Sequence, residues 1–289
     1  MIRLFKKDSG RPAASSPQSD VKTAPLSYIP QIELPDTLEV SMASVIGTRL
    51  DQQDTMRLQL IDAGVAAVIC DGMGGLSNGQ LASRTAADTF LDAVAHVPAS
   101  ELPDSLAQIL ESSSDAVCRT ARGGGSTLVG AVVCGRSLFF CSVGDSKLFI
   151  FRAGQMVCAT REHTVRLLLN ERLQRGQISH AQYQRELSHA EALISYLGAP
   201  SLCYTDISCA PFELQPGDTI LLCSDGLYRS IPEDRLQQIV CGYAGSFCTL
   251  ADYLVSTAAR LCAQRDNTSV ILLRMRAPEP EKMQFDTTV

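Results

Sequence analysis

Four aspartates stand out by their position, and three of them lie where a strand-like run of residues ends or begins. Asp71 ends the apolar run VAAVIC and opens DGMGG, and Asp225 ends TILLCS and opens DGLY. Asp266 directly precedes NTSVILL, and Asp54 lies upstream in TRLDQQD. Strand ends that meet at one edge of a sheet bring such carboxylates close together. Close carboxylates in a poorly solvated site repel one another strongly unless a cation neutralises them.

A hard divalent cation is the ligand that this set suggests, because oxygen-only donors suit Mg²⁺ or Mn²⁺. The glycines after Asp71, at positions 72, 74 and 75, let a backbone carbonyl approach a ligand closely. The competing interpretation is an ordinary turn, since Asp-Gly after a strand is a common turn signal and any single one is more often a turn than a ligand. The prediction of a metal site therefore depends on the whole set of aspartates.

Blocks of strand and helix must position these aspartates. Residues 126–159 predict consecutive strands joined by short GRS and AGQ turns, which favours antiparallel neighbours. Helical spacing predicts a helix from Gln80 to about Val97, two helical segments after residue 159, and a last helix around residues 247–261. In the second middle segment the spacing runs from Tyr183 to Leu197. The pattern predicts an α+β domain with antiparallel sheets covered by helices.

Composition divides the 289 residues into one domain and two flanking segments. Residues 1–38 hold five of the 13 prolines and predict a flexible Pro-rich leader, of which only the last residues would dock on the domain. Residues 277–289 have the same texture and predict a disordered tail. Residues 39–276 between them fall in the usual size range of a single domain.

Charge and cysteine usage exclude several classes of protein. A net charge of −6 argues against nucleic acid as a partner, because binding to phosphate backbones depends on basic surface. The longest apolar runs have the length of strands, so no membrane insertion is expected. The 11 cysteines contain no CxxC pair. They predict neither a disulfide framework nor a zinc site but mostly buried small side chains in a reducing cytosol.

Seven motifs in order give the sequence a specific resemblance. They are GTRLDQQD, VAAVICDGMGG, GGGSTLVGAVV, CSVGDSKLFIFRAGQM, TREHT, PGDTILLCSDGL and RDNTSVILL. Together they resemble the metal-dependent serine/threonine protein phosphatases (the PPM or protein phosphatase 2C-like family), bacterial type, over about residues 44–275. The resemblance implies a β-sandwich of two antiparallel sheets flanked by helices on both outer faces. It also implies a cytoplasmic enzyme whose substrates are proteins phosphorylated by a cognate serine/threonine kinase.

The resemblance further implies a centre with two Mn²⁺ or Mg²⁺ ions. Asp71 resembles the carboxylate that bridges both ions, with the Gly72 carbonyl as a further ligand. Asp225 and Asp266 would hold the first ion, and Asp54 would hold a metal-bound water. The expected reaction is hydrolysis of phosphoserine or phosphothreonine by a hydroxide that bridges the two ions.

Four further positions of the resemblance affect substrate and metal binding. Arg49 resembles the arginine that binds the substrate phosphate, a role that suits its bidentate guanidinium. Asp145 resembles a ligand of a third, more weakly held ion; the alternative is a carboxylate that caps a turn. Gln53 stands where many relatives have a metal-ligating glutamate, so the second ion should bind less tightly. Lys147 replaces the usual arginine and is expected to be a solvated strand charge.

Two alternatives remain open beside the active phosphatase. The first is a pseudo-phosphatase, a catalytically weak or inactive module that binds phosphoproteins in regulation, which the neutral Gln53 would favour. A nucleophilic cysteine is set aside because no cysteine opens a C-x5-R loop. The second is that the chain acts mainly as the phosphatase arm of a kinase-controlled switch, with the Pro-rich leader as a docking segment. A separate redox hypothesis concerns the active enzyme: Cys70 and Cys223 lie one and two residues before Asp71 and Asp225, so their oxidation would disturb the metal site.

Overall fold

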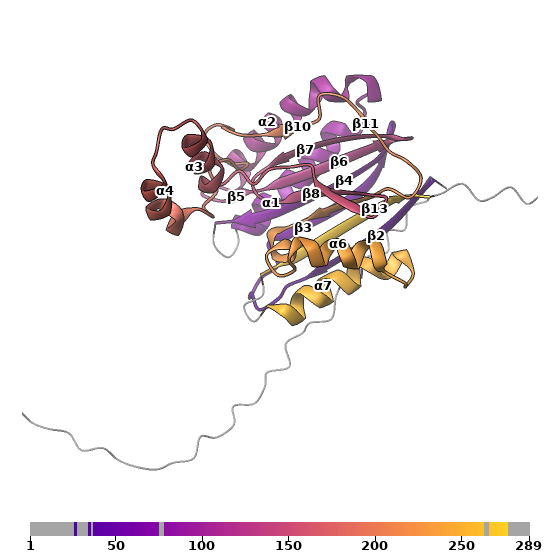
Figure 1. Ribbon diagram of the computed structural model, residues 1–289. Helices are drawn as coiled ribbons and strands as arrows, with labels where there is room; N and C mark the ends of the chain where they lie inside the picture. The colour runs from indigo at the N-terminus through magenta and orange to yellow at the C-terminus, as the bar shows by residue number, and fades with distance from the viewer. Residues whose placement is uncertain (1–25, 28–33, 36, 75–77, 263–265, 277–289) are drawn as a thin grey trace, which may run out of the picture.

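Two antiparallel sheets stacked face to face form the centre of the molecule, and helices cover both outer faces (Figure 1). The computed structural model describes residues 26–27, 34–35, 37–74, 78–262 and 266–276. Most of the predicted leader and all of the predicted tail, residues 277–289, lie outside the described residues. The predicted α+β sandwich is confirmed.

The first sheet has the strand order β1-β2-β13-β12-β8-β9. Its strand β13 is central although it is last in sequence, because it pairs with β2 on one side and β12 on the other. The bounds of its strands are β1 Leu26–Ser27, β2 Leu38–Val45, β8 Lys147–Arg152, β9 Gln155–Cys158, β12 Thr219–Cys223 and β13 Thr268–Met275.

The second sheet has the strand order β10-β7-β6-β4-β3, with β11 paired to β7 and β5 paired to β4. Short turns join β3 to β4 and β6 to β7, and the second of these is the GRS turn that the sequence predicted within residues 126–159. The bounds of its strands are β3 Asp54–Ile61, β4 Gly64–Met73, β5 Gly125–Ser126, β6 Leu128–Cys134, β7 Ser137–Val143, β10 Asp206–Ile207 and β11 Phe212–Glu213.

Three apolar layers result because both faces of each sheet are buried. Along β4, Val65, Ala67 and Ile69 face the first sheet, whereas Ala66 and Val68 face the helices α1 and α2. This explains the continuous apolar run in the sequence, since a strand covered on both faces does not alternate with polar residues. The outer helices are α1 Asn78–Val94 and α2 Leu102–Thr120 on the second sheet, and α5 Asp225–Tyr228, α6 Glu233–Gly242 and α7 Leu250–Leu261 on the first.

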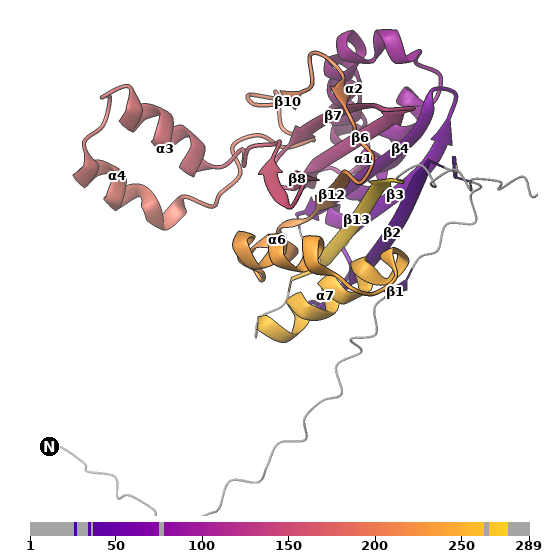
Figure 2. The ribbon, with the colours of Figure 1, turned by 45° about the vertical axis from the view of Figure 1, so that its right-hand side comes forward.

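Helices α3 (Val165–Gln174) and α4 (His180–Glu186) extend away from the sandwich as a separate excursion (Figure 2). The prediction of a helix from Tyr183 to Leu197 holds only as far as the 3₁₀ turn at Leu187–His189, and it is wrong for the residues after that turn. The reason is that the backbone N–H groups of these residues bond to distant segments of the chain and not to a preceding helical turn. The Ile194 N–H donates to the His163 carbonyl at 2.9 Å, and the Leu197 N–H donates to the Ser126 carbonyl at 2.8 Å. Further 3₁₀ turns are Ala99–Glu101 and Phe247–Thr249.

Two features differ from what composition suggested. All 11 cysteines are free thiols, but Cys70, Cys141 and Cys223 are the buried ones and five others are exposed, so the prediction that most fill the core is wrong. The first sheet also begins inside the predicted leader, because β1 pairs with β2. Among the helices that the structure describes, none has the length and apolar character needed to cross a membrane.

Candidate functional site

Strand register brings Asp54 and Asp71 together in the second sheet. The two residues are direct cross-strand partners at the end of β3 and β4. Thr127 fixes the backbone of Asp71 on the other side: its Oγ1 accepts the Asp71 N–H at 2.9 Å, and its N–H donates to the Asp71 carbonyl at 2.8 Å. The carboxylate of Asp71 is therefore held between two neighbouring strands.

The first sheet presents three more aspartates at the same end of the sandwich. Cys223 of β12 pairs with Lys147 of β8, and two residues beyond this pair lie Asp225 on one strand and Asp145 on the other. Antiparallel register therefore brings these two carboxylates together. Asp266 lies two residues before β13, which is the other neighbour of β12.

Asp71 lies at the centre of the cluster, where the four other carboxylates all repel its charge. Burial raises the pKa of Asp71 well above its ordinary value, and the charges of Asp54, Asp225, Asp145 and Asp266 raise it further. Burial likewise raises the pKa of Asp54 to about 6 and that of Asp225 to about 7, with other aspartates adding to both shifts. All five aspartates thus act on one another electrostatically, as sequence reasoning expected for a cation site.

A hydrogen bond links the two sheets inside the cluster. The Ser224 hydroxyl donates to Asp54 Oδ2 at 2.8 Å, and the Ser269 N–H donates to the Ser224 oxygen at 3.0 Å. Asp54 Oδ1 and Asp225 Oδ1 are buried and have no hydrogen-bond partner among the residues described. Buried acceptors without partners are costly, and a bound cation is one way to satisfy them.

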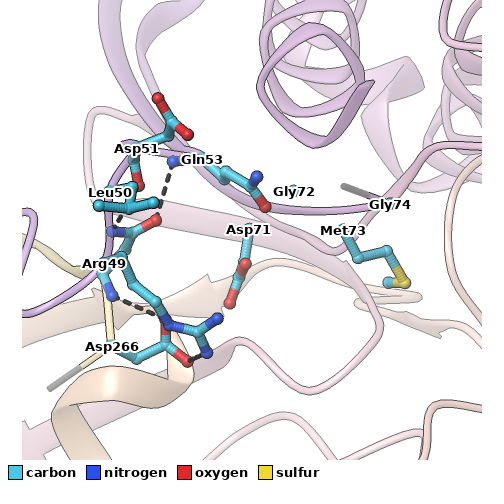
Figure 3. Close-up of a pocket in the computed structure, with 10 residues that line it drawn as sticks. Arg49, Leu50, Asp51, Gln53, Asp71, Gly72, Met73, Gly74 and Asp266 are labelled. Carbon is cyan, nitrogen blue, oxygen red and sulfur yellow. Dashed lines mark hydrogen bonds and ion pairs between the residues drawn. The ribbon is translucent and has the colours of Figure 1, made fainter. Parts of the chain in front are cut away.

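A cavity of about 530 Å³ opens beside Asp71 and is lined by Arg49, Gly72 and Asp266 as well as Gln53. Figure 3 shows the Arg49 side chain reaching across to Asp266, with Asp71 next to both. Arg49 Nη2 lies 2.6 Å from Asp266 Oδ2, while 62% of the Arg49 side chain remains exposed. The structure therefore places the predicted phosphate-binding arginine at the mouth of the acidic cavity.

Gly72 is required by close packing of the chain. A Cβ at this position would lie 2.0 Å from the Gly79 carbonyl oxygen at the start of α1 and 2.8 Å from the Gln53 carbonyl oxygen. No side chain fits there, because real Cβ contacts are much longer. The Gln53 amide lies against the same helix start, at Gly79. This neutral side chain thus lines the cavity without adding a charge.

The donor set fits two hard cations, although within the described part of the chain no three His, Cys, Asp or Glu side chains converge closely enough to form a ready-made site. Two of the aspartates instead face arginines: Asp266 pairs with Arg49, and Asp225 pairs with Arg229 at 2.8 Å. The donors are all oxygens, two of them are buried without partners, and their charges raise one another's pKa. These are the properties of a site for Mg²⁺ or Mn²⁺.

The third-ion position does not fit a metal in the same way. The carboxylate of Asp145 is 3.1 Å from Arg229 Nη2, so a guanidinium already neutralises it. Sequence reasoning missed Arg229, although its position one helical turn after Asp225 is a visible signal for an ion pair. It also missed Ser224 and Thr127, whose roles depend on which strands become neighbours.

Lys147 is buried, so its interpretation as a solvated charge is wrong. Only 7% of the residue is exposed. Its Nζ lies 2.7 Å from Glu162 Oε1 and 4.0 Å above the centre of the Tyr228 ring. A carboxylate and an aromatic face therefore compensate for the loss of water around the ammonium group.

Comparisons with known proteins agree with this geometry. The chain is 28% identical to the serine/threonine phosphatase Stp of Listeria innocua over 218 residues, which is 71% of this chain and 82% of the relative. It is 26% identical to the protein phosphatase PhpP of Streptococcus pneumoniae over 261 residues, covering 84% and 100% of the two chains.

The solved structure of the Streptococcus agalactiae serine/threonine phosphatase matches with a TM-score of 0.72 at 22% identity, covering 83% of this chain and all of the other. The catalytic domain of the phosphatase PstP, solved in complex with two manganese ions, matches with a TM-score of 0.65 at 22% identity, covering 83% and 99%. The sequence profile of protein phosphatase 2C matches residues 43–260. The chain therefore belongs to the protein phosphatase 2C family.

Proposed function

We propose that this protein phosphatase hydrolyses phosphoserine and phosphothreonine on proteins with the help of two Mn²⁺ or Mg²⁺ ions. The observation that carries the proposal is the position of Asp71. It lies among four other aspartates and beside a cavity whose mouth carries Arg49. A strongly acidic cavity attracts a phosphate group only when cations are present, and the exposed arginine supplies a contact for the phosphate itself.

Four groups of this chain would hold the ions. Asp71 would contact both, the Gly72 carbonyl would be a further ligand, and Asp225 and Asp266 would hold the first ion. When bound, two divalent ions lower the pKa of a water molecule and neutralise charge on the phosphoryl group. The complex of the similar phosphatase PstP with two manganese ions supports the proposal of two divalent ions, while the choice of ligands depends on the acidic cluster described above.

Arg49 and Asp54 would place the reactants. A guanidinium has five N–H donors, so Arg49 can keep its bond to Asp266 and still donate to two phosphate oxygens. Asp54 has one carboxylate oxygen fixed by Ser224, and its other oxygen has no partner among the described residues. The second oxygen would accept a hydrogen bond from the attacking water and so orient it toward phosphorus.

The biological setting is part of the proposal. The substrates would be proteins phosphorylated by a cognate serine/threonine kinase, and the 11 free thiols suit a reducing, cytoplasmic environment. The catalytic unit would be the predicted domain, residues 39–276, extended at its N-terminal side by β1.

Hydrolysis of p-nitrophenyl phosphate and of a phosphothreonine peptide, with Mn²⁺, with Mg²⁺ and with EDTA, tests the function. We expect turnover only with a divalent cation. The variant Asp225→Asn should lose more than about 100-fold in kcat, since it removes a direct ion ligand. The control Asp92→Asn removes the same charge from an exposed position of α1 and should keep full activity.

Two outcomes would contradict the proposal. Turnover that survives EDTA would exclude the metal-dependent mechanism. Binding of Mn²⁺ and of the phosphopeptide without any hydrolysis would instead support the pseudo-phosphatase alternative.

A further inference from the structure

Arg229 directs each of its three guanidinium nitrogens at a different carboxylate. Its Nε lies 2.8 Å from Asp225 Oδ2, its Nη2 lies 3.1 Å from Asp145 Oδ2, and its Nη1 lies 3.4 Å from Glu191 Oε2. The side chain is 38% exposed, so it lies at the rim of the acidic cluster. The planar fork of a guanidinium is well suited to such a three-way contact, whereas an ammonium group is not.

The resemblance assigns Asp145 to a third ion, and Asp225 is the carboxylate that the register places opposite it. Asp145 and Asp225 face each other across the extended register of β8 and β12. Asp145 is only 5% exposed, so its charge needs a nearby cation. Arg229 supplies that cation from the same helix turn that carries Asp225.

The third carboxylate belongs to the base of the α3–α4 excursion. Glu191 pairs with Arg166 in the first turn of α3 as well as with Arg229. The neighbouring backbone is tied to the same place, because the Arg166 N–H donates to the Ala190 carbonyl at 2.8 Å. Arg229 therefore connects the aspartate cluster to the base of the α3–α4 excursion.

We propose that Arg229 occupies the place of a third divalent ion between Asp145 and Asp225, and that the same guanidinium positions the α3–α4 excursion through Glu191. This inference rests on the proposed two-ion function. An arginine side chain remains protonated at all physiological pH values, and because it belongs to the chain it cannot leave the site as a bound metal ion can. The excursion would therefore keep its position at metal concentrations that fill only the two principal sites.

Counting bound Mn²⁺ tests the first half of the inference without using activity. The full chain is titrated with Mn²⁺, and binding is monitored by calorimetry and by the electron paramagnetic resonance signal of free Mn²⁺. We expect two bound ions per wild-type chain. Arg229→Gln should gain a third, weaker ion, and adding Asp145→Asn to that variant should remove it again. Arg229→Lys should keep the count at two because it keeps the charge.

Hydrogen–deuterium exchange of residues 165–191 tests the second half. Exchange should be at least about tenfold faster in Arg229→Gln and in Glu191→Gln, because each loses the contact that holds the base of the excursion. Glu191→Gln should still bind two ions, which separates the two roles of Arg229. The matched control is Arg235→Gln, an exposed arginine on the next helix, which should change neither reading.

Each failure points to a different error. A wild-type chain that binds no Mn²⁺ and hydrolyses no phosphoester refutes the proposed function. A wild-type chain with two ions and full activity, combined with an unchanged count in Arg229→Gln, overturns only the role of Arg229. Three ions in the wild-type chain overturn that role as well. If Arg229→Gln does not fold, the folded Glu191→Gln variant decides the positioning role, and normal exchange in it refutes that role.

Discussion

Replacing Asp54 by asparagine should stabilise the metal-free protein, and the gain should grow with pH. Asp54 is buried, and its pKa is raised from 3.8 to about 6, chiefly by burial and further by Asp266. Asparagine keeps an oxygen that can accept the Ser224 hydroxyl but carries no charge. The substitution thus removes the repulsion while preserving the bond between the sheets.

The sign and size follow from the two pKa values. The folded chain holds this proton more tightly than the unfolded chain, so the carboxyl contributes its full stability below about pH 3.8 and loses it as the pH rises through about 6. The complete loss corresponds to roughly 3 kcal/mol. Between pH 5 and pH 8 the advantage of asparagine should increase by about half of this amount, because part of the loss has already occurred by pH 5.

Urea unfolding in EDTA, near pH 5 and near pH 8, measures this difference for the wild type and for Asp54→Asn. The control is Asp92→Asn, which removes an exposed carboxylate and should give equal differences at both pH values. Excess Mn²⁺ should reverse the order of stability near pH 8, because the wild-type cluster gains more from bound ions. An Asp54→Asn variant that is equally destabilised at both pH values would refute the electrostatic reasoning.

Three further predictions follow from packing. Gly72→Ala should destabilise the fold by about 3 kcal/mol or more, measured by urea unfolding, because its Cβ would lie 2.0 Å from a backbone oxygen. Brief treatment with N-ethylmaleimide should modify the exposed thiols but leave the fully buried Cys70 and Cys223 unlabelled and the activity intact. Mass spectrometry of the labelled peptides measures this, and the expected result contradicts the redox hypothesis. Deleting residues 1–25 should leave the melting temperature unchanged, whereas deleting residues 1–33 removes β1 but keeps β2 and should lower it; equal melting temperatures would show that β1 contributes nothing.

The aspartate site could be predicted because strand ends are visible in the sequence. Asp71 follows its apolar run directly and Asp225 follows its run after one serine, and the antiparallel register places Asp71 opposite Asp54 and Asp225 near Asp145. Arg229 shows the limit of this reasoning. Its ion pair with Asp225 is local, but its contacts with Asp145 and Glu191 depend on which strands and loops become neighbours.

The helices show a similar division between local pattern and tertiary context. Helix α1 was predicted because its apolar residues recur regularly, whereas α2 was missed because Ser113 and Ser114 interrupt its apolar face although both are buried. Helix α6 was also missed, since Leu236 is the one residue of this helix that is fully buried. The residues after α4 that were wrongly predicted to be helical have good helical spacing, but their backbone N–H groups bond to loop residues and not to a preceding helical turn.

The position of β13 in the first sheet has a consequence for the protein during its synthesis. Strand β13 is the central neighbour of both β2 and β12, and Asp266 lies just before it, so the ribosome makes the middle of the sheet after its edges. A nascent chain that ends before residue 266 lacks both Asp266 and the strand that pairs with β2 and β12. Such truncated chains should therefore be devoid of phosphatase activity, which an activity assay of a chain that ends at residue 265 would test.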